Sequence, residues 1–95
     1  MVYTDHYSET LTEILKKLKK KNPKQCEAIL KKISSILQAV QENPDHYKPL
    51  QHGMAGFKRV HIHKSFVLVF KVDHANRLVK FEDYDHHDNM YRKYR

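Results

Sequence analysis

The chain is poor in cysteine, glycine and long apolar runs, and each shortage excludes a class of protein. Among its 95 residues are one cysteine, two glycines and no tryptophan. Because Cys26 is alone, no disulfide can form within the chain, and its place on the apolar face of an expected helix favours buried packing. Two glycines cannot build a phosphate-cradling loop, and no glycine elbow surrounds Ser65 as a nucleophile. No apolar stretch approaches the length that spans a bilayer.

These limits leave a small protein with one hydrophobic core. Hydrophobic residues make up 40% of the chain, which is too many for a chain that is disordered by composition. Residues 1–6 lack the charged-then-apolar pattern of a signal peptide, so we expect a cytoplasmic protein. A chain of 95 residues has room for one modest core, and we expect a single domain over residues 1–95.

Positive charge and histidine are abundant. Lysine and arginine number 18 against 11 acidic residues, which gives a formal net charge of +7 with the eight histidines counted as neutral. Such a basic chain suits a polyanionic partner such as nucleic acid. It would equally suit an acidic protein, or a domain whose lysines only keep it in solution.

Two amphipathic helices are expected in the first half. Leucine and isoleucine recur at helical spacing over residues 9–21, with Ser8 or Thr10 as the candidate N-cap. Asn22-Pro23 then starts a second helix, because Asn caps helices and Pro is favoured at the first helical position. Asn43-Pro44 ends it, and the short connection predicts an antiparallel pair. The apolar stripe of the second helix comprises Cys26, Ile29, Leu30, Ile33, Leu37 and Val40.

The second half predicts a sheet. Residues 43–56 hold two of the three prolines and both glycines, which indicates a loop. Strands are expected at 57–63, 66–72 and 77–84, with a further short strand in residues 1–7. The order β-α-α-β-β-β predicts an α+β fold, in which an N-terminal two-helix hairpin packs on one face of a small, mainly antiparallel sheet. In strand 57–63, Val60 and Ile62 face one side, whereas Phe57, Arg59, His61 and His63 face the other.

The histidines follow two neighbouring strands and suggest acid–base chemistry. An imidazole gives or takes a proton near neutral pH. Cleavage of RNA by its own 2′-hydroxyl needs a base at that hydroxyl, an acid at the 5′ leaving oxygen, and cations around the transition state. Taken singly, an exposed strand histidine is more often a bystander. The candidate cations are Lys58, Arg59, Lys64 and Lys80, and the candidate base-stacking rings are Phe57, Phe66, Tyr84 and Tyr91.

A metal site is the competing interpretation. His61 and His63, two residues apart on a strand, could chelate an ion, and His86, His87 and Asp88 could add ligands. Against this, two adjacent histidines cannot easily aim at one ion from regular structure, no cysteine joins them, and no HExxH pair exists. We therefore expect no metal and no cofactor.

Four stretches carry a likeness to a known family. They are residues 47–53 (Tyr-Lys-Pro-Leu-Gln-His-Gly), 56–63 (Gly-Phe-Lys-Arg-Val-His-Ile-His), the apolar strand 66–70 and the ending 81–88. The chain resembles the RelE/ParE toxin superfamily, and most of all its YafQ-like and archaeal RelE-like members. The resemblance implies a type II toxin that cuts mRNA in the ribosomal A site. It also implies a cognate antitoxin, and a ribosome with mRNA and ribosomal RNA, as partners.

The resemblance also implies roles for single residues. His87 corresponds to the general acid and His61 to the strand histidine of the site, with His63 as a second candidate base. Phe66 and Tyr91 correspond to aromatic contacts with RNA. We expect RNA-binding by these two rings and by the cations Lys58, Arg59, Lys64 and Lys80.

Two positions depart from the family pattern. Ser65 stands where the family often has a carboxylate, and Asp83 stands where it often has an arginine. These departures keep open a non-catalytic, ParE-like toxin, or an RNA- or protein-binding module of the same fold.

Overall fold

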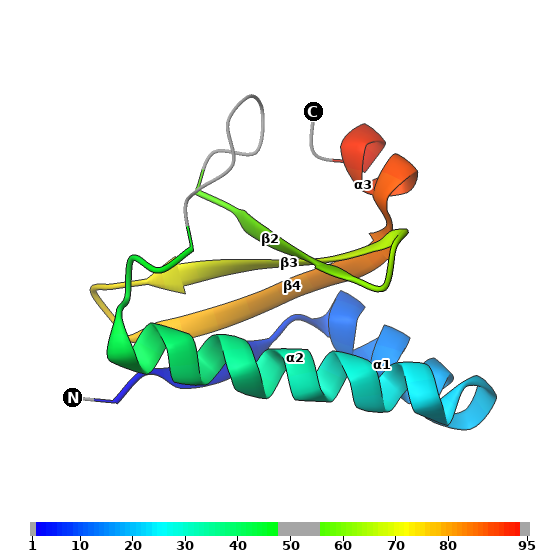
Figure 1. Cartoon of the computed structure of the whole chain (residues 1–95), viewed down its shortest axis with the longest axis horizontal. Coiled ribbons are helices and arrows are strands. Elements are labelled where there is room, and N and C mark those ends of the chain that lie inside the picture. Colours follow the sequence, from blue (N-terminus) through cyan, green and yellow to red (C-terminus); the bar gives the residue numbers. More distant parts are fainter. Residues whose placement is uncertain (1, 48–55, 94–95) are drawn as a thin grey trace.

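The structure, a computed structural model, describes residues 2–47 and 56–93 (Figure 1). The α+β class and the β-α-α-β-β-β order are confirmed, and a short helix follows the last strand. The expected loop at 43–56 lies largely outside the described residues. The elements are β1 (Thr4–Tyr7), α1 (Glu9–Lys21), α2 (Pro23–Glu42), β2 (Lys58–Ile62), β3 (Phe66–Asp73), β4 (Leu78–His86) and α3 (His87–Lys93).

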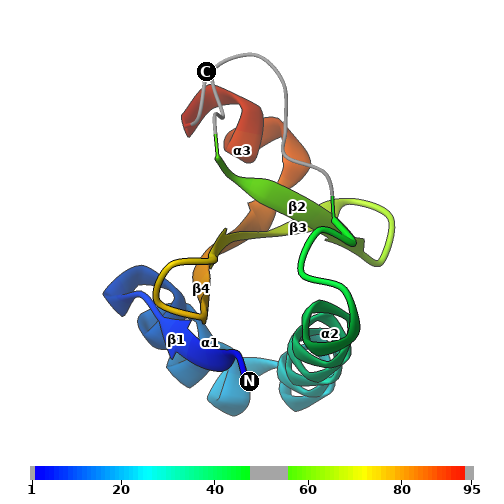
Figure 2. The same cartoon turned by 90° about the vertical axis from the view of Figure 1, so that its left-hand side faces the viewer.

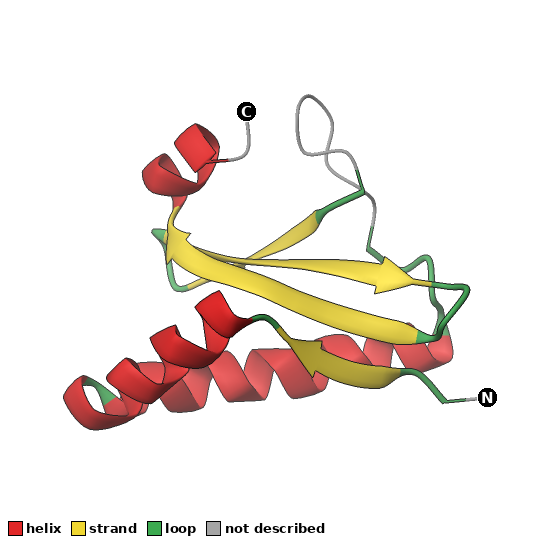
Figure 3. Ribbon diagram, turned by 180° about the vertical axis from the view of Figure 1, so that it is seen from behind, coloured by secondary structure: helices red, strands yellow, loops and turns green. Residues whose placement is uncertain are grey.

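The strands form one sheet in the order β1-β4-β3-β2. β1 runs parallel to β4, and the other two pairings are antiparallel. The helix pair α1–α2 lies on one side of the sheet and α3 on the other, as Figure 2 shows. Seen from behind, the end of β4 passes directly into α3 above the turn between β2 and β3 (Figure 3).

Both long helices begin where the sequence predicts. Ser8 is the N-cap of α1, because its Oγ accepts a hydrogen bond from the Leu11 backbone N–H at 3.0 Å. The same hydroxyl donates to the Glu82 carbonyl at 2.6 Å and so ties the helix start to β4. Asn22 caps α2, and Pro23 takes its first helical position. Local capping chemistry therefore sets both boundaries.

The main core lies between the helix pair and the sheet. Leu11 of α1, Ile29 and Ile36 of α2, and Phe70 and Phe81 of the sheet are fully buried there. Cys26 is buried, as its pattern predicts. No helix among the described residues has the length and apolar character needed to cross a membrane.

One residue of the predicted α2 stripe was placed wrongly. Leu30 is 48% exposed, whereas Ile36, which the stripe omitted, is completely buried. The buried face follows Ile29, Ile33, Ile36 and Val40 at spacings of four, three and four residues. Leu30 is one residue, or about 100° of helix rotation, away from that face. It lies beside a groove between α1 and α2 instead.

A β-bulge between β3 and β4 decides which side chains face α3. Val69 pairs with Asp83 and Phe70 pairs with Phe81, so Glu82 has no partner in the ladder. An extra residue shifts the alternation of a strand. As a result Tyr84 joins the core with Phe81, whereas Asp83 lies on the α3 side.

A second, smaller apolar cluster lies on the α3 side of the sheet. It contains Val67, Val69 and Met90, with Phe57 packed against it. Met90 is 2% exposed, so it is the apolar contact by which α3 rests on the sheet.

The two bonds of the Ser8 hydroxyl predict its contribution to stability. Ser8→Ala should lower the free energy of unfolding by about 1–2 kcal/mol, because the first turn of α1 and the Glu82 carbonyl each lose a partner. Thr10→Ala, at the alternative cap position, is the matched control and should change it by less than about 0.5 kcal/mol. Urea unfolding measures both, and equal effects would contradict the assignment of Ser8 as the cap.

Candidate active site at the end of the last strand

His87 lies at the junction where β4 becomes α3. Its backbone N–H donates to the Ser65 carbonyl at 2.8 Å, so the β2–β3 turn lies directly beside it. The side chain is 43% exposed, and its Nε2 lies 3.4 Å from the Asp88 carboxylate. Its Nδ1 is buried and has no hydrogen-bond partner among the described residues. The ring thus presents Nε2, next to a carboxylate, as its accessible nitrogen.

Arg59 and Tyr91 form a cation–aromatic pair beside this histidine. The Arg59 Nη1 donates to the Tyr91 hydroxyl at 2.6 Å, and its guanidinium carbon lies 5.0 Å from the centre of the same ring. The rings of Tyr91 and His87 are 6.1 Å apart in an edge-to-face arrangement. An arginine from β2 therefore meets α3 one helical turn after His87. All three residues are candidates from the sequence, and the structure brings them together.

Phe66 of β3 contacts both Tyr84 and His86 of β4. Its ring stacks on Tyr84 at 5.3 Å and meets His86 edge-on at 5.7 Å. Tyr84 is only 4% exposed, so it belongs to the core and is not a surface for stacking bases. Phe66 is half-buried and lines two shallow grooves toward the helix pair.

His61 shares the face of Arg59 at the edge of the sheet. It pairs with Val67, which pairs with Asp85, so it lies two strand spacings, about 10 Å, from β4. His63 is not a strand residue: its φ of 59° places it in the β2–β3 turn, so the predicted alternation ends at Ile62. Both histidines line a groove toward Lys31 and Lys32 of α2, among other residues.

Lys64 is exposed in the same turn. It borders a neighbouring groove that also contains Lys24 of α2. The cations Lys24, Lys31, Lys32 and Lys64 therefore follow the space between α2 and the β2–β3 turn. This basic path leads toward the junction that carries His87.

Two predicted RNA-binding lysines do not join the site. Lys58 is 6% exposed and pairs with Phe70 on the core face, so it cannot serve as a surface contact for phosphate. Burial lowers the pKa of its ammonium, although the charge of Asp45 opposes this. Lys80 lies near the start of β4 and pairs with Asp73 at 3.5 Å. Seven residues of strand put it about 20 Å from His87.

An ion-pair cluster fixes α3 to the sheet. Lys93 lies 3.1 Å from Asp83 and 2.8 Å from Asp85. Burial opposes ionisation of both Asp85 and Lys93. For Asp85 the hydrogen bonds from Lys93, Asn89 and the His86 backbone N–H outweigh burial, so its pKa is lowered. For Lys93 the hydrogen bonds to Asp85 and Asp83 and their charges outweigh burial, so its pKa is raised. Asp83, which is 3% exposed, also accepts the Tyr84 backbone N–H at 2.8 Å. The acidic residue at the family's arginine position is therefore paired beneath α3.

Comparison with known sequences identifies the family. The family described as the ParE toxin of type II toxin–antitoxin system, parDE, matches residues 1–91. The chain belongs to this family. A "Putative toxin RelE4" of Methanocaldococcus jannaschii is 52% identical over 92 residues, which cover 97% of this chain and 94% of that protein. An uncharacterized protein of Methanosarcina mazei is 56% identical over 75 residues, 79% of this chain and 83% of that protein.

Solved structures of RelE/ParE toxins share the fold. YafQ from E. coli superposes with a TM-score of 0.70 at 20% identity, covering 94% of this chain and 98% of YafQ. The RelBE2 toxin–antitoxin complex of Mycobacterium tuberculosis contains a chain that matches with a TM-score of 0.65 at 22% identity, covering 90% of this chain and 99% of that one. The predicted superfamily is confirmed, and the chain is a type II toxin of the RelE/ParE superfamily.

Sequence reasoning missed two residues that shape the site. Asp88 was considered only as a metal ligand, yet its carboxylate lies 3.4 Å from the Nε2 of His87. The pairing of Lys93 with the acidic residues of β4 was not predicted, because the sequence leaves the structure of the tail after Tyr91 undecided. Asp83 and Asp85 are two residues apart on one strand face, and this spacing is the one signal that a cation would be needed there.

Removing Lys93 tests how α3 is held. Lys93→Met should lower the free energy of unfolding by about 1–2 kcal/mol, because Asp83 and Asp85 lose their contacts with the Lys93 ammonium while solvent screens part of the loss. Lys16→Met, which removes an exposed pair with Glu13, is the matched control and should cost less than about 0.5 kcal/mol.

The same pair predicts a pH dependence. A lowered pKa at Asp85 stabilises the fold above the ordinary carboxyl value of about 4, and this gain is lost as the pH falls through the lowered pKa. The raised pKa of Lys93 gives a gain that is full below about 10.4 and is lost as the pH rises through the raised value. Urea unfolding at several pH values should show that the free energies of unfolding of the parent and of Lys93→Met converge in acid. A difference that persists at pH 2 would contradict the ion-pair account.

Proposed function

We propose that the chain is a ribosome-dependent endoribonuclease that cuts mRNA in the A site by metal-independent acid–base catalysis in the cytoplasm. The observation that carries the proposal is the meeting of His87, Tyr91 and Arg59 at the β4–α3 junction. It combines a proton donor and a positive charge, two of the groups that cleavage by a 2′-hydroxyl requires, with an aromatic surface that can contact a base.

Each residue has a role in this reaction. His61 takes the proton of the 2′-hydroxyl, with His63 of the adjoining turn as the second candidate base. The 2′-oxygen bonds to phosphorus, the bond to the 5′-oxygen breaks, and His87 gives its Nε2 proton to that leaving oxygen. The products are a 2′,3′-cyclic phosphate and a 5′-hydroxyl. The Asp88 carboxylate lies 3.4 Å from the Nε2 of His87 and places a negative charge beside the ring.

The charge on the phosphate is balanced by Arg59. Its side chain is oriented by the Tyr91 hydroxyl, which limits the freedom of the guanidinium before RNA arrives. Lys64 and the lysines of α2 supply the path along which mRNA or ribosomal RNA lies, and Phe66 offers a ring for a base.

The partners follow from the family and the charge. The RelBE2 and DinJ–YafQ structures are toxin–antitoxin complexes, which supports a cognate antitoxin for this chain. A net charge of +7 suits an acidic partner segment as well as RNA.

A second candidate function is poisoning of a protein target without RNA cleavage. The description of the matching family as a ParE toxin favours it. Mapping of mRNA ends in cells that express the chain alone separates the two functions. Cuts at A-site codons support the nuclease, whereas growth arrest without new mRNA ends supports the protein target.

Replacing His87 tests the general acid. His87→Gln keeps a polar side chain but cannot donate an acidic proton, so RNA cleavage on programmed ribosomes should fall by about 10²–10⁴-fold and growth arrest should be relieved. His6→Gln, an exposed histidine on β1 at the far edge of the sheet, is the matched control and should retain cleavage. Circular dichroism confirms that both variants fold. Parental cleavage by His87→Gln would remove His87 from the mechanism.

Replacing Tyr91 tests whether its hydroxyl positions the Arg59 side chain. Tyr91→Phe keeps the ring but removes the hydroxyl that accepts the Arg59 hydrogen bond. We expect cleavage to fall by about tenfold, equivalent to about 1.4 kcal/mol in the barrier, mainly in kcat and with unfolding unchanged. Tyr7→Phe, whose hydroxyl contacts Asp5 on β1, controls for the loss of a phenol group. An unchanged kcat in Tyr91→Phe would show that the pair does not position Arg59.

A further inference from the structure

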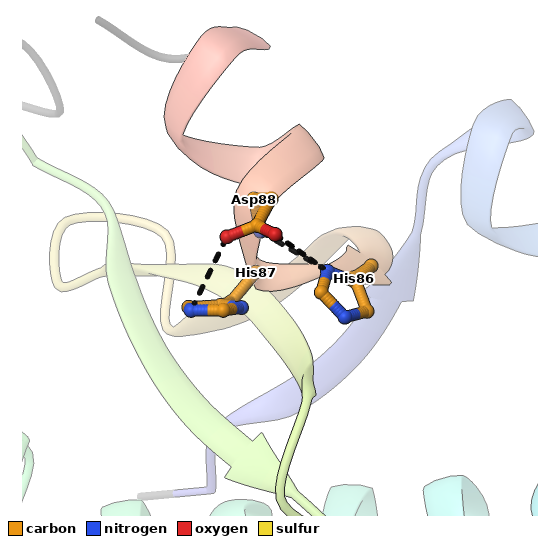
Figure 4. A group of neighbouring side chains, drawn as sticks. All are labelled: His86, His87 and Asp88. Atoms are coloured by element: carbon orange, nitrogen blue, oxygen red, sulfur yellow. Dashed lines mark hydrogen bonds and ion pairs between the residues drawn. The ribbon is translucent and has the colours of Figure 1, made fainter.

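We propose that His86, His87 and Asp88 form a binding site for a divalent transition-metal ion of the Zn²⁺ class, and that the ion blocks His87. Within the described residues, these three side chains form a group whose ligand atoms all lie within 4.8 Å of one another. Figure 4 shows that the two imidazoles approach the Asp88 carboxylate from either side.

The site exists because the two histidines belong to different elements. On one strand, adjacent side chains point to opposite faces. For this reason the sequence alone disfavours an ion shared by His86 and His87. Here β4 ends at His86 and α3 begins at His87. The change of backbone direction brings the rings to 5.1 Å between their centres. A boundary between strand and helix therefore removes the geometric objection.

The distances suit tetrahedral coordination. His87 Nε2 lies 3.4 Å from Asp88 Oδ1, and His86 Nδ1 lies 3.7 Å from Asp88 Oδ2. Zinc–ligand bonds of about 2.0–2.1 Å give a tetrahedral edge of about 3.3 Å, so each imidazole already lies near that spacing from one of the two Asp88 oxygens. Rotation of the side chains would bring both nitrogens around a single oxygen, because one ligand atom from each residue lies within 4.8 Å of the others. The Asp88 backbone N–H donates to His86 Nδ1 at 3.3 Å, and the ion would replace this long bond. Water can fill the fourth position.

The donor set selects the class of ion. Two imidazole nitrogens and one carboxylate suit Zn²⁺, Ni²⁺ or Cu²⁺, whereas Mg²⁺ and Ca²⁺ prefer oxygen ligands throughout. Among the described residues, His61 and His63 belong to no such group of three ligand side chains.

The consequence for activity rests on the proposed function. Nε2 of His87 is the atom that would carry the proton for the leaving oxygen, and it cannot hold a proton and a metal ion at once. A bound ion would therefore silence the toxin without unfolding it.

Zinc titration of the untagged, purified chain tests the site. Competition against a chromophoric chelator should show one Zn²⁺ per chain, and Co²⁺ should give the visible bands of tetrahedral coordination. His86→Gln and Asp88→Asn should each weaken binding at least tenfold, while His6→Gln and the double variant His61→Gln/His63→Gln should bind as the parent does. The proposed site would be contradicted if the parent does not bind Zn²⁺, if all variants bind Zn²⁺ equally, or if only the double variant loses the ion.

Cleavage assays with added Zn²⁺ test the blocking of His87. Inhibition should follow the same saturation curve as binding, and His86→Gln, normalised to its own zinc-free rate, should need at least tenfold more Zn²⁺. Binding without inhibition would overturn the blocking role. A chain that binds Zn²⁺ but never cleaves RNA would overturn the proposed nuclease function while leaving the metal site standing.

Discussion

The contact of Lys93 with Asp83 and Asp85 is the interaction on which the proposed site depends. It fixes the end of α3 to the sheet, and Met90 fixes the middle of the same helix. His87 and Tyr91 are both carried by α3, so their distance from Arg59 on β2 is set by this attachment. A helix of seven residues would not be stable alone, and its structure comes from these tertiary contacts.

The β-bulge at Glu82 makes this arrangement possible. It lets Tyr84 enter the core and Asp83 face α3, although strict alternation would place Phe81 and Asp83 on one face. The acidic segment that departs from the family pattern therefore has a structural role beneath α3. The chain supplies a cation to the site from another strand, through Arg59.

Much of the fold could be predicted because its signals are local. Helical periodicity and the caps at Ser8 and Asn22 act within a few residues, and both helix starts agree with the structure. The strand alternation of β2 also places Lys58 with Val60 and Ile62, so its burial was readable from the pattern that was used to select it for RNA binding. The bulge and α3 were not predictable, because both depend on partners that are distant in the sequence.

The candidate site likewise combines residues that the sequence reveals with long-range contacts that it does not reveal. The sequence supplied His87, Arg59 and Tyr91 as candidates, but the contact between Arg59 and Tyr91 spans 32 residues and no spacing rule contains it. His63 was assigned to a strand face because alternation does not reveal where a strand ends. Its positive φ shows that the turn begins one residue earlier than expected. The relation between His86 and His87 likewise depends on a boundary between strand and helix that the sequence does not mark.

The central claim is that His87 and Arg59 support cleavage of RNA by its own 2′-hydroxyl. The chemical identity of the RNA ends formed on programmed ribosomes tests it most directly. The account predicts a 2′,3′-cyclic phosphate on the upstream fragment and a 5′-hydroxyl on the downstream fragment. A 3′-hydroxyl with a 5′-phosphate would contradict it, because water and not the 2′-hydroxyl would then be the nucleophile.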